Sequence, residues 1–306
     1  MSANALSGKV ILITGAAGGI GNATAVQLAR RGARLVLADL DTSALKRAEA
    51  RVPGDTSTVS VDVTDADSCA DAVHATLQRH GRIDAVWANA GISAYGPMDL
   101  MDSAVWRRVI EVNLLGSYNI VQSALPGIIE QRGYVALTAS WASFAHSPGH
   151  SAYAASKAGM EAFANCLRSE LACTGVQVGV FHPGWVDTPM VTEKRDHQPA
   201  FRALLDSLPA PLRSLTAVDE LSVVLADAFT RRSAKVIYPR RGWALHVLRA
   251  LLPTKFATAR ARKAAPDIRR LFAEQMTTRA TGACQSPVML SSAAGKRSAA
   301  GRKGNP

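Results

Sequence analysis

Residues 9–21 read "KVILITGAAGGIG". A short apolar run with strand-forming side chains leads directly into a turn that contains four glycines, and a helical pattern begins at Ile20. Glycine lets a backbone turn tightly and approach a pyrophosphate closely, while free N–H groups at a helix N-terminus hold negative charge. The stretch therefore predicts the first strand, turn and helix of a dinucleotide-binding fold. In the turn we expect Gly15, Gly19, Ile20 and Gly21 to bind the cofactor.

The sequence up to Pro239 repeats this alternation of short apolar runs and longer helical patterns. Further strands are expected at 34–39, 57–63, 83–91, 134–140, 176–184 and 234–239. Continuous apolar strands separated by helices are typical of a parallel sheet covered on both faces, and right-handed crossovers make the sheet doubly wound. We expect a single α/β domain of the Rossmann type over residues 1–239. A long helical stretch over 103–131 carries Pro126, which we expect to kink or end the helix.

The formal net charge of +11 is concentrated at the end of the chain. Of the 35 basic residues, 14 lie from Arg240 onward, together with only 2 of the 24 acidic residues, so residues 1–239 are nearly neutral. This favours a basic tail over a nucleic-acid-binding fold, and the tail also lacks interleaved aromatic residues on which bases stack. We predict a basic amphipathic helical extension over 240–276 and a disordered, Ser/Gly/Ala/Lys-rich tail over 277–306.

The extension contains a mostly apolar segment, Trp243–Leu252, with arginines and lysines on both sides. Its length is too short to cross a bilayer. An apolar segment with cationic flanks is typical of a helix that lies in an anionic membrane interface. Alternatively, Trp243, Leu245, Leu248 and Leu252 pack on the body of the protein or against a second subunit. Both interpretations stay open at this point.

No leader with a charged start and an apolar run precedes the first strand, and no segment reaches the roughly 18 apolar residues of a spanning helix. We therefore expect a cytoplasmic protein, peripheral at a membrane surface if the extension binds lipid. The cysteines show neither a CxxC motif nor metal-ligand spacing, so we expect free thiols and no metal site. They are Cys69, Cys166, Cys173 and Cys284.

An acidic residue, Asp39, ends the second predicted strand. At this place a carboxylate binds both ribose hydroxyls of a dinucleotide and repels the 2′-phosphate of NADP. Asp39 therefore predicts NAD, with NADP as the alternative. Four further residues close the third and fourth strands, at the carboxyl edge where α/β proteins bind ligands. These expected cofactor contacts are Asp62, Val63, Asn89 and Gly91.

The stretch "GHSAYAASKAGMEAF" (149–163) is rich in alanine and predicts a helix. Tyr153 and Lys157 stand four residues apart and so share one helix face, among small neighbours. By itself the pair fits either an ordinary amphipathic helix or a reactive phenol beside an ammonium.

The motifs of the chain, taken together and in order, decide between these interpretations. They are "TGAAGGIG" (14–21), "DV" (62–63), "NAG" (89–91), Asn113, Ser140, Tyr153-x-x-x-Lys157 and "PGWVDT" (183–188). With them, residues 6–240 resemble the short-chain dehydrogenase/reductase superfamily. One departure is Ala88, which stands where the family's fourth-strand motif usually begins with a second asparagine. The departure puts little in doubt, because Asn89 and Gly91 are present.

The resemblance implies a role for each residue of a catalytic tetrad. Tyr153 is expected to exchange a proton with the substrate oxygen, and Lys157 to acidify that phenol and bind the nicotinamide ribose. Ser140 is expected to orient the substrate oxygen, and Asn113 to hold a water that links Lys157 to solvent. Tyr153 and Lys157 also count as cofactor contacts, as do Val186 and Thr188 in "PGWVDT".

Substrate contacts are expected from Ser140, Tyr153, His150 and Trp141 because of their place beside the tetrad. The long segment over 190–215, after the cofactor-binding motif, is typical of a lid over an active site. Its apolar residues favour an apolar substrate, steroid-like or a long-chain alcohol. The alternative is that this segment packs on the body as an ordinary helix.

The leading hypothesis is an NAD(H)-dependent oxidoreductase that interconverts a secondary alcohol and a ketone, acting as a homodimer or homotetramer. A second hypothesis is an NADPH-dependent carbonyl or 3-oxoacyl reductase, against which Asp39 argues. A third is a dinucleotide-sensing protein without turnover, against which the intact tetrad argues.

Overall fold

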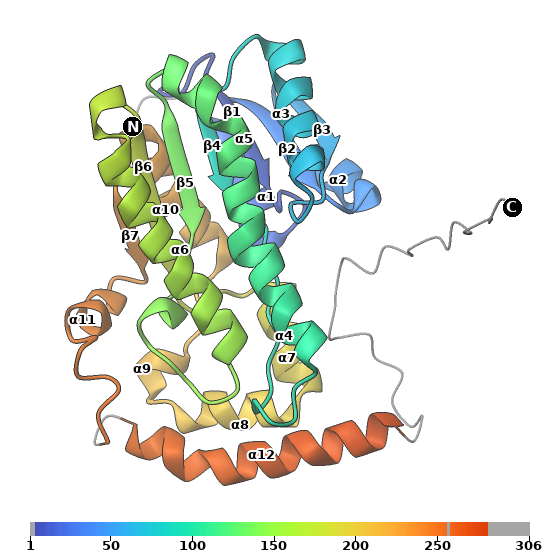
Figure 1. Ribbon diagram of the computed structural model, residues 1–306, viewed down its shortest axis with the longest axis vertical. Helices are drawn as coiled ribbons and strands as arrows, with labels where there is room; N and C mark the ends of the chain where they lie inside the picture. The colour runs from blue at the N-terminus through green and yellow to red at the C-terminus, as the bar shows by residue number, and fades with distance from the viewer. Residues whose placement is uncertain (1–3, 256–257, 281–306) are drawn as a thin grey trace, which may run out of the picture.

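A seven-stranded parallel sheet forms the centre of the protein (Figure 1). The computed structural model describes residues 4–255 and 258–280. The strands are β1 (Val10–Thr14), β2 (Arg34–Asp39), β3 (Thr56–Ser60), β4 (Ala85–Ala88), β5 (Tyr134–Thr138), β6 (Gln177–Pro183) and β7 (Lys235–Tyr238). Their order in the sheet is β3-β2-β1-β4-β5-β6-β7. The order reverses between β1 and β4, which is the switch point where α/β proteins bind ligands. The predicted doubly wound α/β fold is confirmed.

Helices cover both faces of this sheet. One face carries α3 (Ala66–His80), α5 (Gly116–Glu130) and α6 (Ser151–Glu170), and the other carries α1 (Gly19–Ala29), α2 (Thr42–Glu49) and α10 (Val218–Arg231). Every residue of β1, β4 and β5 is buried between these layers. The long apolar runs in the sequence are explained by this two-sided burial.

The core beside β4 is aromatic. Trp87 packs edge-on against Phe181 and Phe229, with ring centroids 6.1 and 5.4 Å apart. Its indole N–H donates at 2.8 Å to the hydroxyl of Thr138, at the end of β5. A buried Trp with a satisfied N–H fixes its neighbours, so this contact holds the carboxyl ends of β4 and β5 in register beneath the site.

The predicted long helix over 103–131 is divided by an irregular turn rather than by its proline. It consists of α4 (Ser103–Ile110), a π-helical turn (Glu111–Leu115) and α5. Pro126 lies inside α5, which continues to Glu130, so the helix does not end at Pro126, and the alternative of a kink stays a prediction. The π-helical turn contains Asn113, in keeping with the frequent occurrence of such turns at functional sites.

Three short helices lie beyond the carboxyl ends of the central strands, where the predicted lid was expected. They are α7 (Pro189–His197), α8 (Pro199–Ser207) and α9 (Ala210–Arg213). Helix α12 (Ala259–Ala280) crosses beneath them in Figure 1 and packs on α8. Ile268 and Phe272 of α12 are buried against Phe201 and Leu204 of α8, and Arg269 pairs with Asp99. Part of the basic extension therefore packs on the segment that was predicted to be a lid.

Two expectations about the extension need correction. The predicted apolar helix over Trp243–Leu252 is helical only in α11 (Gly242–Val247), and residues 248–255 form turns. The tail predicted to be disordered from Thr277 is helical as far as Ala280; residues 281–306 lie outside the described part of the chain. None of the helices within the described ranges has the length and apolar content needed to span a bilayer.

Candidate active site

The glycine-rich turn between β1 and α1 is packed so tightly that side chains are excluded. Gly15 has a φ of +64°, and a Cβ at this position would lie 2.7 Å from Cα of Ala90. A Cβ on Gly21 would lie 2.4 Å from the carbonyl oxygen of Gly15, and one on Gly19 would lie 2.8 Å from Cγ2 of Thr188. Since real Cβ atoms do not come so close, the turn requires glycine at these positions.

The N-terminus of α1 offers free donors at this turn. Its N-cap, Gly18, has no side chain to bond the first-turn N–H groups, and no acidic residue occupies the first turn. Helical N–H groups in this position are the usual partners of a phosphate. The turn and the helix start therefore fit the pyrophosphate of a dinucleotide.

Asp39 lies at the tip of β2, beside the turn. Its carboxylate accepts from the N–H groups of Ala17 at 3.1 Å and Leu40 at 2.8 Å. Burial raises the pKa of Asp39, although these backbone donors act in the opposite direction. The carboxylate is thus held rigidly where a ribose would pass on its way from the pyrophosphate to the adenine.

Asn89, just after β4, forms hydrogen bonds with the ends of β1 and β5. Its amide nitrogen donates to the carbonyl oxygens of Thr14 and Gly15 at 3.1 and 3.3 Å, and its amide oxygen accepts from the hydroxyl of Thr138 at 3.1 Å. A Cβ on Gly91 would lie 3.4 Å from the ammonium of Lys157. Both residues therefore line the edge that carries the glycine-rich turn.

The other expected cofactor contacts lie along the same edge. Asp62 bonds the backbone N–H and hydroxyl of Thr64 at 2.9 and 2.7 Å, so its carboxylate shapes the loop after β3. Val63 is buried against Gly116 of α5. Val186 is buried after β6, and Thr188 is the N-cap of α7. Their contact with a cofactor stays a prediction.

Tyr153 and Lys157 lie one turn apart on α6. The Lys157 ammonium lies 5.7 Å from the centre of the Tyr153 ring and donates at 2.6 Å to the carbonyl oxygen of Thr138. Burial lowers the pKa of Lys157 to about 7. Burial raises the pKa of the Tyr153 phenol, and the nearby hydroxyl of Ser140 acts in the opposite direction.

Asn113 and Ser140 complete the predicted tetrad. The Asn113 amide accepts from the N–H of Ile92 at 2.8 Å and donates to the carbonyl of Ile92 and the hydroxyl of Ser156, each at 3.0 Å. Its side chain is therefore a positioning group for α6, and the water relay stays a prediction. The hydroxyl of Ser140, just after β5, accepts from the N–H of Ala142 at 3.1 Å and borders the same pocket as Tyr153.

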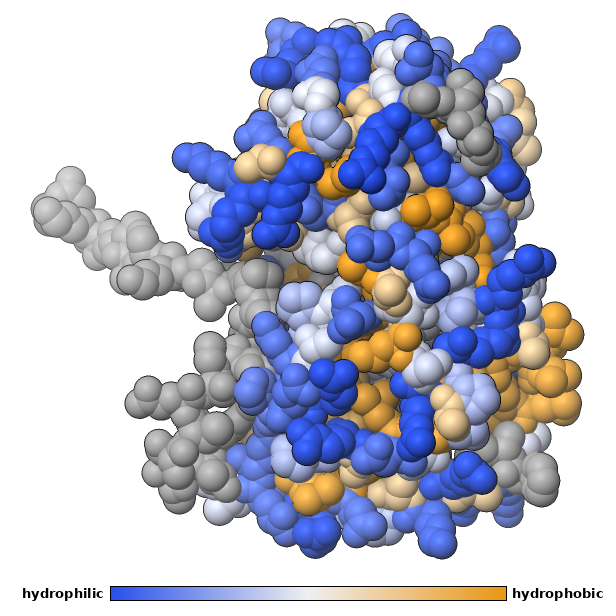
Figure 2. All heavy atoms as spheres, turned by 180° about the vertical axis from the view of Figure 1, so that it is seen from behind, coloured by the Kyte–Doolittle hydropathy of each residue, from blue (hydrophilic) through white to orange (hydrophobic). Residues whose placement is uncertain are grey.

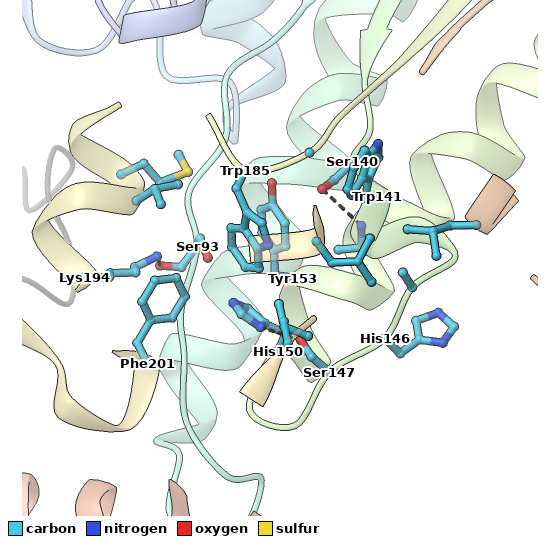
Figure 3. Close-up of a pocket in the computed structure, with 18 residues that line it drawn as sticks. Ser93, Ser140, Trp141, His146, Ser147, His150, Tyr153, Trp185, Lys194 and Phe201 are labelled. Carbon is cyan, nitrogen blue, oxygen red and sulfur yellow. Dashed lines mark hydrogen bonds between the residues drawn. The ribbon is translucent and has the colours of Figure 1, made fainter. Parts of the chain in front are cut away.

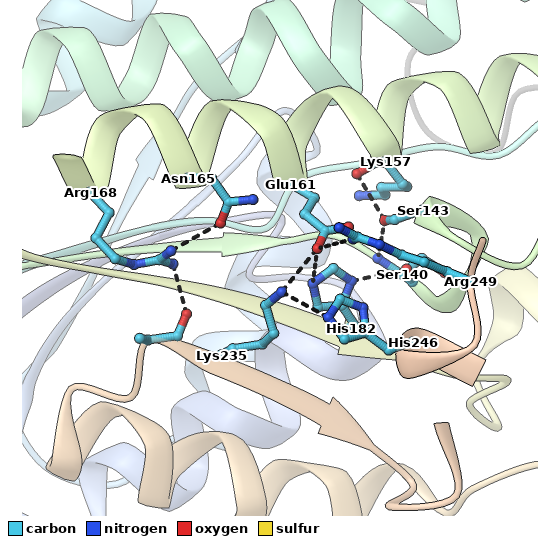
Figure 4. A network of polar contacts seen from close by, with 11 residues as sticks. Ser140, Ser143, Lys157, Glu161, Asn165, Arg168, His182, Lys235, His246 and Arg249 are labelled. Atoms are coloured by element: carbon cyan, nitrogen blue, oxygen red, sulfur yellow. Dashed lines mark hydrogen bonds and ion pairs between the residues drawn. The ribbon is translucent and has the colours of Figure 1, made fainter. Parts of the chain in front are cut away.

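A buried polar network, missed in the sequence, lies behind Ser140 (Figure 4). The ring nitrogen Nδ1 of His182 lies 3.1 Å from the carbonyl oxygen of Ser140. On its other side, Nε2 lies 3.9 Å from the Glu161 carboxylate, which also bonds Lys235 at 3.0 Å and Arg249 at 3.4 Å. The network thus joins α6, β6, β7 and the extension to the loop that holds Ser140. These residues are far apart in sequence, so no local pattern indicated them.

The pocket itself has a volume of about 850 Å³, part of it open to solvent. Figure 3 shows Tyr153 and Trp185 between Ser140 and Trp141 on one side and Lys194 and Phe201 on the other. All four expected substrate residues line it. The lining includes Ser93, Ser140, Trp141, His146, His150, Tyr153, Trp185, Met190, Lys194, Phe201, Leu208, Leu212 and Leu245.

Two kinds of lining residue stand out. The walls are mostly apolar, with two tryptophans, a phenylalanine and several aliphatic side chains. His150 is buried among Tyr95, Tyr153 and Trp185, and burial lowers its pKa to about 3, so its ring is neutral. Sequence reasoning missed Ser93, Trp185 and Lys194 as part of the pocket. The available signals were the motif "PGWVDT", which contains Trp185, and the predicted lid segment 190–215, which contains Lys194.

Comparisons with known proteins agree with this geometry. A family model described as short chain dehydrogenase matches residues 9–199. The chain is 39% identical over 194 residues to the 3-oxoacyl-(acyl-carrier-protein) reductase FabG of Thermotoga maritima, covering 62% of this chain and 78% of the relative. It is 32% identical over 237 residues to an uncharacterized oxidoreductase of Myxococcus xanthus, covering 76% and 94%.

Solved structures show the same likeness. Levodione reductase superposes with a TM-score of 0.69 and 30% identity, over 76% of this chain and 96% of that one. The 3-ketoacyl-(acyl-carrier-protein) reductase of Brucella melitensis, solved in complex with NADH, superposes with a TM-score of 0.69 and 25% identity, over 76% and 97%. The family match spans most of the sheet and the whole predicted tetrad, so this chain belongs to the short-chain dehydrogenase family of oxidoreductases.

Proposed function

We propose that the protein interconverts a secondary alcohol and a ketone with NAD(H), on an apolar substrate. The observation that carries the proposal is that Ser140 and Tyr153 line one mostly apolar pocket, with Lys157 one helical turn behind the phenol. The pocket opens at the same sheet edge as the glycine-rich turn. A dinucleotide bound at that turn supplies a hydride acceptor or donor.

The roles of the residues follow from their positions. In the oxidative direction Tyr153 takes the hydroxyl proton of the substrate, and in the reductive direction it returns that proton to the ketone oxygen. The positive charge of Lys157 favours the phenolate through space. Ser140 donates to the substrate oxygen and fixes its orientation toward Tyr153. Asn113 keeps α6, and with it the phenol, in place through Ser156.

The cofactor preference rests on Asp39. Its half-buried carboxylate accepts N–H bonds from Ala17, Leu40 and Asp41, and an added 2′-phosphate would meet a like charge there. This supports NAD over NADP. The NADH complex of the Brucella melitensis reductase supports the same choice by likeness. An NADPH-dependent carbonyl or 3-oxoacyl reductase is the competing function, favoured by the name of the Thermotoga maritima relative.

The test is a parallel screen of full-length protein with NAD and NADP, against hydroxysteroids, aliphatic secondary alcohols and the matching ketones. Turnover of a secondary alcohol or its ketone with NAD(H), lost in Tyr153→Phe, supports the proposal. Turnover only with NADP(H) would establish the competing function. Dinucleotide binding without turnover of any substrate would favour a sensing protein.

We also propose that the surface around α11 contacts an anionic membrane. Trp243, Val247, Leu248 and Leu251 are 43%, 74%, 51% and 59% exposed. Figure 2 shows apolar side chains protruding at the edge of the molecule where α11 lies. Arg240, Arg249 and Lys255 border them, so the patch combines an apolar anchor with cations.

Packing on the body explains the position of Leu245 but not the exposed apolar residues of α11 and the turns that follow it. Leu245 lies against Trp141 and Phe144 and lines the substrate pocket, as the packing interpretation requires. The four exposed residues are not among the apolar residues packed in that cluster. A membrane-bound α11 would therefore bring lipid next to the pocket of an enzyme with an apolar substrate. Members of the family form oligomers, and we expect a homodimer or homotetramer here.

A further inference from the structure

Lys194, in the lid helix α7, is buried at the substrate pocket with one protein partner. Its side chain is 6% exposed, and its ammonium donates to the carbonyl oxygen of Ser93 at 2.6 Å. Over residues 4–255 and 258–280, no carboxylate lies within 4.0 Å of this ammonium, and no second acceptor bonds it. An ammonium has three N–H donors, so two remain for a ligand.

The surroundings of Lys194 do not balance its charge. Among the described residues, the pocket lining contains His146 and His150 in addition to this lysine, and no aspartate or glutamate. Burial lowers the pKa of Lys194 to about 7, and the neighbouring Glu193 acts in the opposite direction with a smaller effect. His150, which faces the same space from the start of α6, is neutral. A buried cation without an anion is costly, so a partner from outside the protein would relieve the cost.

The place of Lys194 relative to the reacting groups suggests what that partner is. In Figure 3 Lys194 and Phe201 reach the pocket from one side, and Ser140 from the other, with Tyr153 and Trp185 between. A substrate whose oxygen is held by Ser140 and Tyr153 would extend along apolar walls toward Lys194. The far end of such a substrate would meet the ammonium.

We propose that Lys194 binds a carboxylate at the far end of the substrate. The natural substrates would then be hydroxy acids with an apolar carbon chain, and the corresponding oxo acids. This inference rests on the proposed function and narrows its substrate class. In the oxidative direction the hydroxy acid loses a hydride to the dinucleotide and a proton to Tyr153, and the carboxylate is unchanged. Lys194 is a specificity-determining residue and takes no part in the proton transfer.

A purely structural role is the competing explanation. The bond from Lys194 to Ser93 links α7 to the loop after β4, and in a purely structural role the lysine would serve only as a latch that holds α7 against this loop. A latch would affect all ligands of the pocket alike. A carboxylate site affects only ligands that carry the negative charge.

The first experiment separates these roles by binding alone. Full-length protein with saturating NAD is titrated with octanoate and with octanamide, which has the same length and no charge. We expect octanoate to bind at least about tenfold more tightly. Lys194→Met should abolish this preference and leave the affinity for octanamide within about twofold. Lys263→Met, which removes an exposed cation from α12, should change neither affinity.

The second experiment measures turnover of a series of unbranched oxo acids and their methyl esters, in which the ketone is moved along the chain. We expect the acids to have lower KM than the esters in the wild-type protein but not in Lys194→Met. If the Met variant does not fold, Lys194→Gln keeps a hydrogen-bond donor and serves the same comparison.

Each outcome has a definite meaning. Equal binding of octanoate and octanamide by the wild-type protein, or an unchanged preference in both Lys194 variants, would overturn the inference. A clear octanoate preference in a protein that turns over no alcohol or ketone would instead overturn the proposed function and leave the carboxylate site standing. Efficient turnover of esters and neutral ketones at the same KM as the acids would overturn the inference alone.

Discussion

The ammonium of Lys157 lies 5.7 Å from the ring centre of Tyr153 and donates to Thr138 rather than to the phenol. Its charge therefore acts on the phenol through space. Burial alone raises the pKa of Tyr153 and lowers that of Lys157 to about 7, so both shifts oppose the formation of a phenolate beside an ammonium. Positive charge added by an oxidised dinucleotide would favour the phenolate, so we expect Tyr153 to act as a base when the cofactor is bound.

Replacing Tyr153 by phenylalanine tests this arrangement. The change keeps the ring and removes the exchangeable proton, so turnover should fall by at least about 10²–10⁴-fold. NAD binding, measured by fluorescence titration, should be largely kept because the ring volume is unchanged. Near-normal turnover would show that another group transfers the proton.

Cofactor selection is tested at Asp39. In Asp39→Ala the lost acceptor should weaken NAD binding by about 10- to 150-fold, since hydrogen bonds to charged groups contribute about 1.5–3 kcal/mol. NADP binding should improve because the repulsion disappears, and the ratio of the two dissociation constants reports both effects. The control is Asp41→Asn, which removes a neighbouring charge but keeps an N-cap side chain on α2. A wild-type protein that binds both cofactors equally would contradict the role of Asp39.

The network behind Ser140 predicts a pH-dependent loss of stability in Glu161→Gln. The Glu161 carboxylate is 7% exposed and bonds Lys235 and Arg249, so its removal should lower the free energy of unfolding by about 2–4 kcal/mol at pH 7. Burial tends to raise the pKa of Glu161, but Lys235, His182 and His246 outweigh it, and the pKa is lowered.

The sign of the pH effect follows from that lowered pKa. The stabilisation is present above the unfolded value of 4.5 and is lost as the pH falls through the folded value. Urea denaturation should therefore show a large difference between wild type and variant at pH 7 that shrinks in acid. Glu170→Gln, on the exposed end of the same helix, should be neutral. A difference that grows in acid would rule out the assigned ion pairs.

The fold was accessible from sequence because it depends on local patterns, whereas the tetrad was named from the resemblance to the family. The glycine turn, the apolar strands and the Tyr153–Lys157 spacing each lie within one or two elements, and periodicity reports such elements directly. The sheet then brings Asn89 and Ser140 to one edge by topology alone. The irregular turn at Asn113 was not visible, because a π-helical turn leaves no separate mark on the apolar pattern.

The lining of the pocket and its buried lysine could not be predicted from the sequence in the same way. Lys194 reads as one of several charged residues in "EKRDH" (193–197), and its burial arises only when α7 folds over the loop that carries Ser93. His182 and Glu161 are likewise brought together by the packing of α6 on β6. Such contacts between distant segments depend on the tertiary structure, which a single sequence does not display.

The surface around α11 gives the last prediction. Full-length protein should sediment at low salt with vesicles of phosphatidylcholine and phosphatidylserine, and not with phosphatidylcholine alone, because each basic residue near an anionic surface contributes about 1 kcal/mol. Val247→Asp combined with Leu251→Asp removes apolar contact and adds negative charge at two exposed positions, so binding should be lost without loss of folding. The matched control is Val223→Asp, which changes an exposed valine of α10. If the wild-type protein stays in the supernatant at low salt, or the double variant binds as well as wild type, α11 does not serve as a membrane contact.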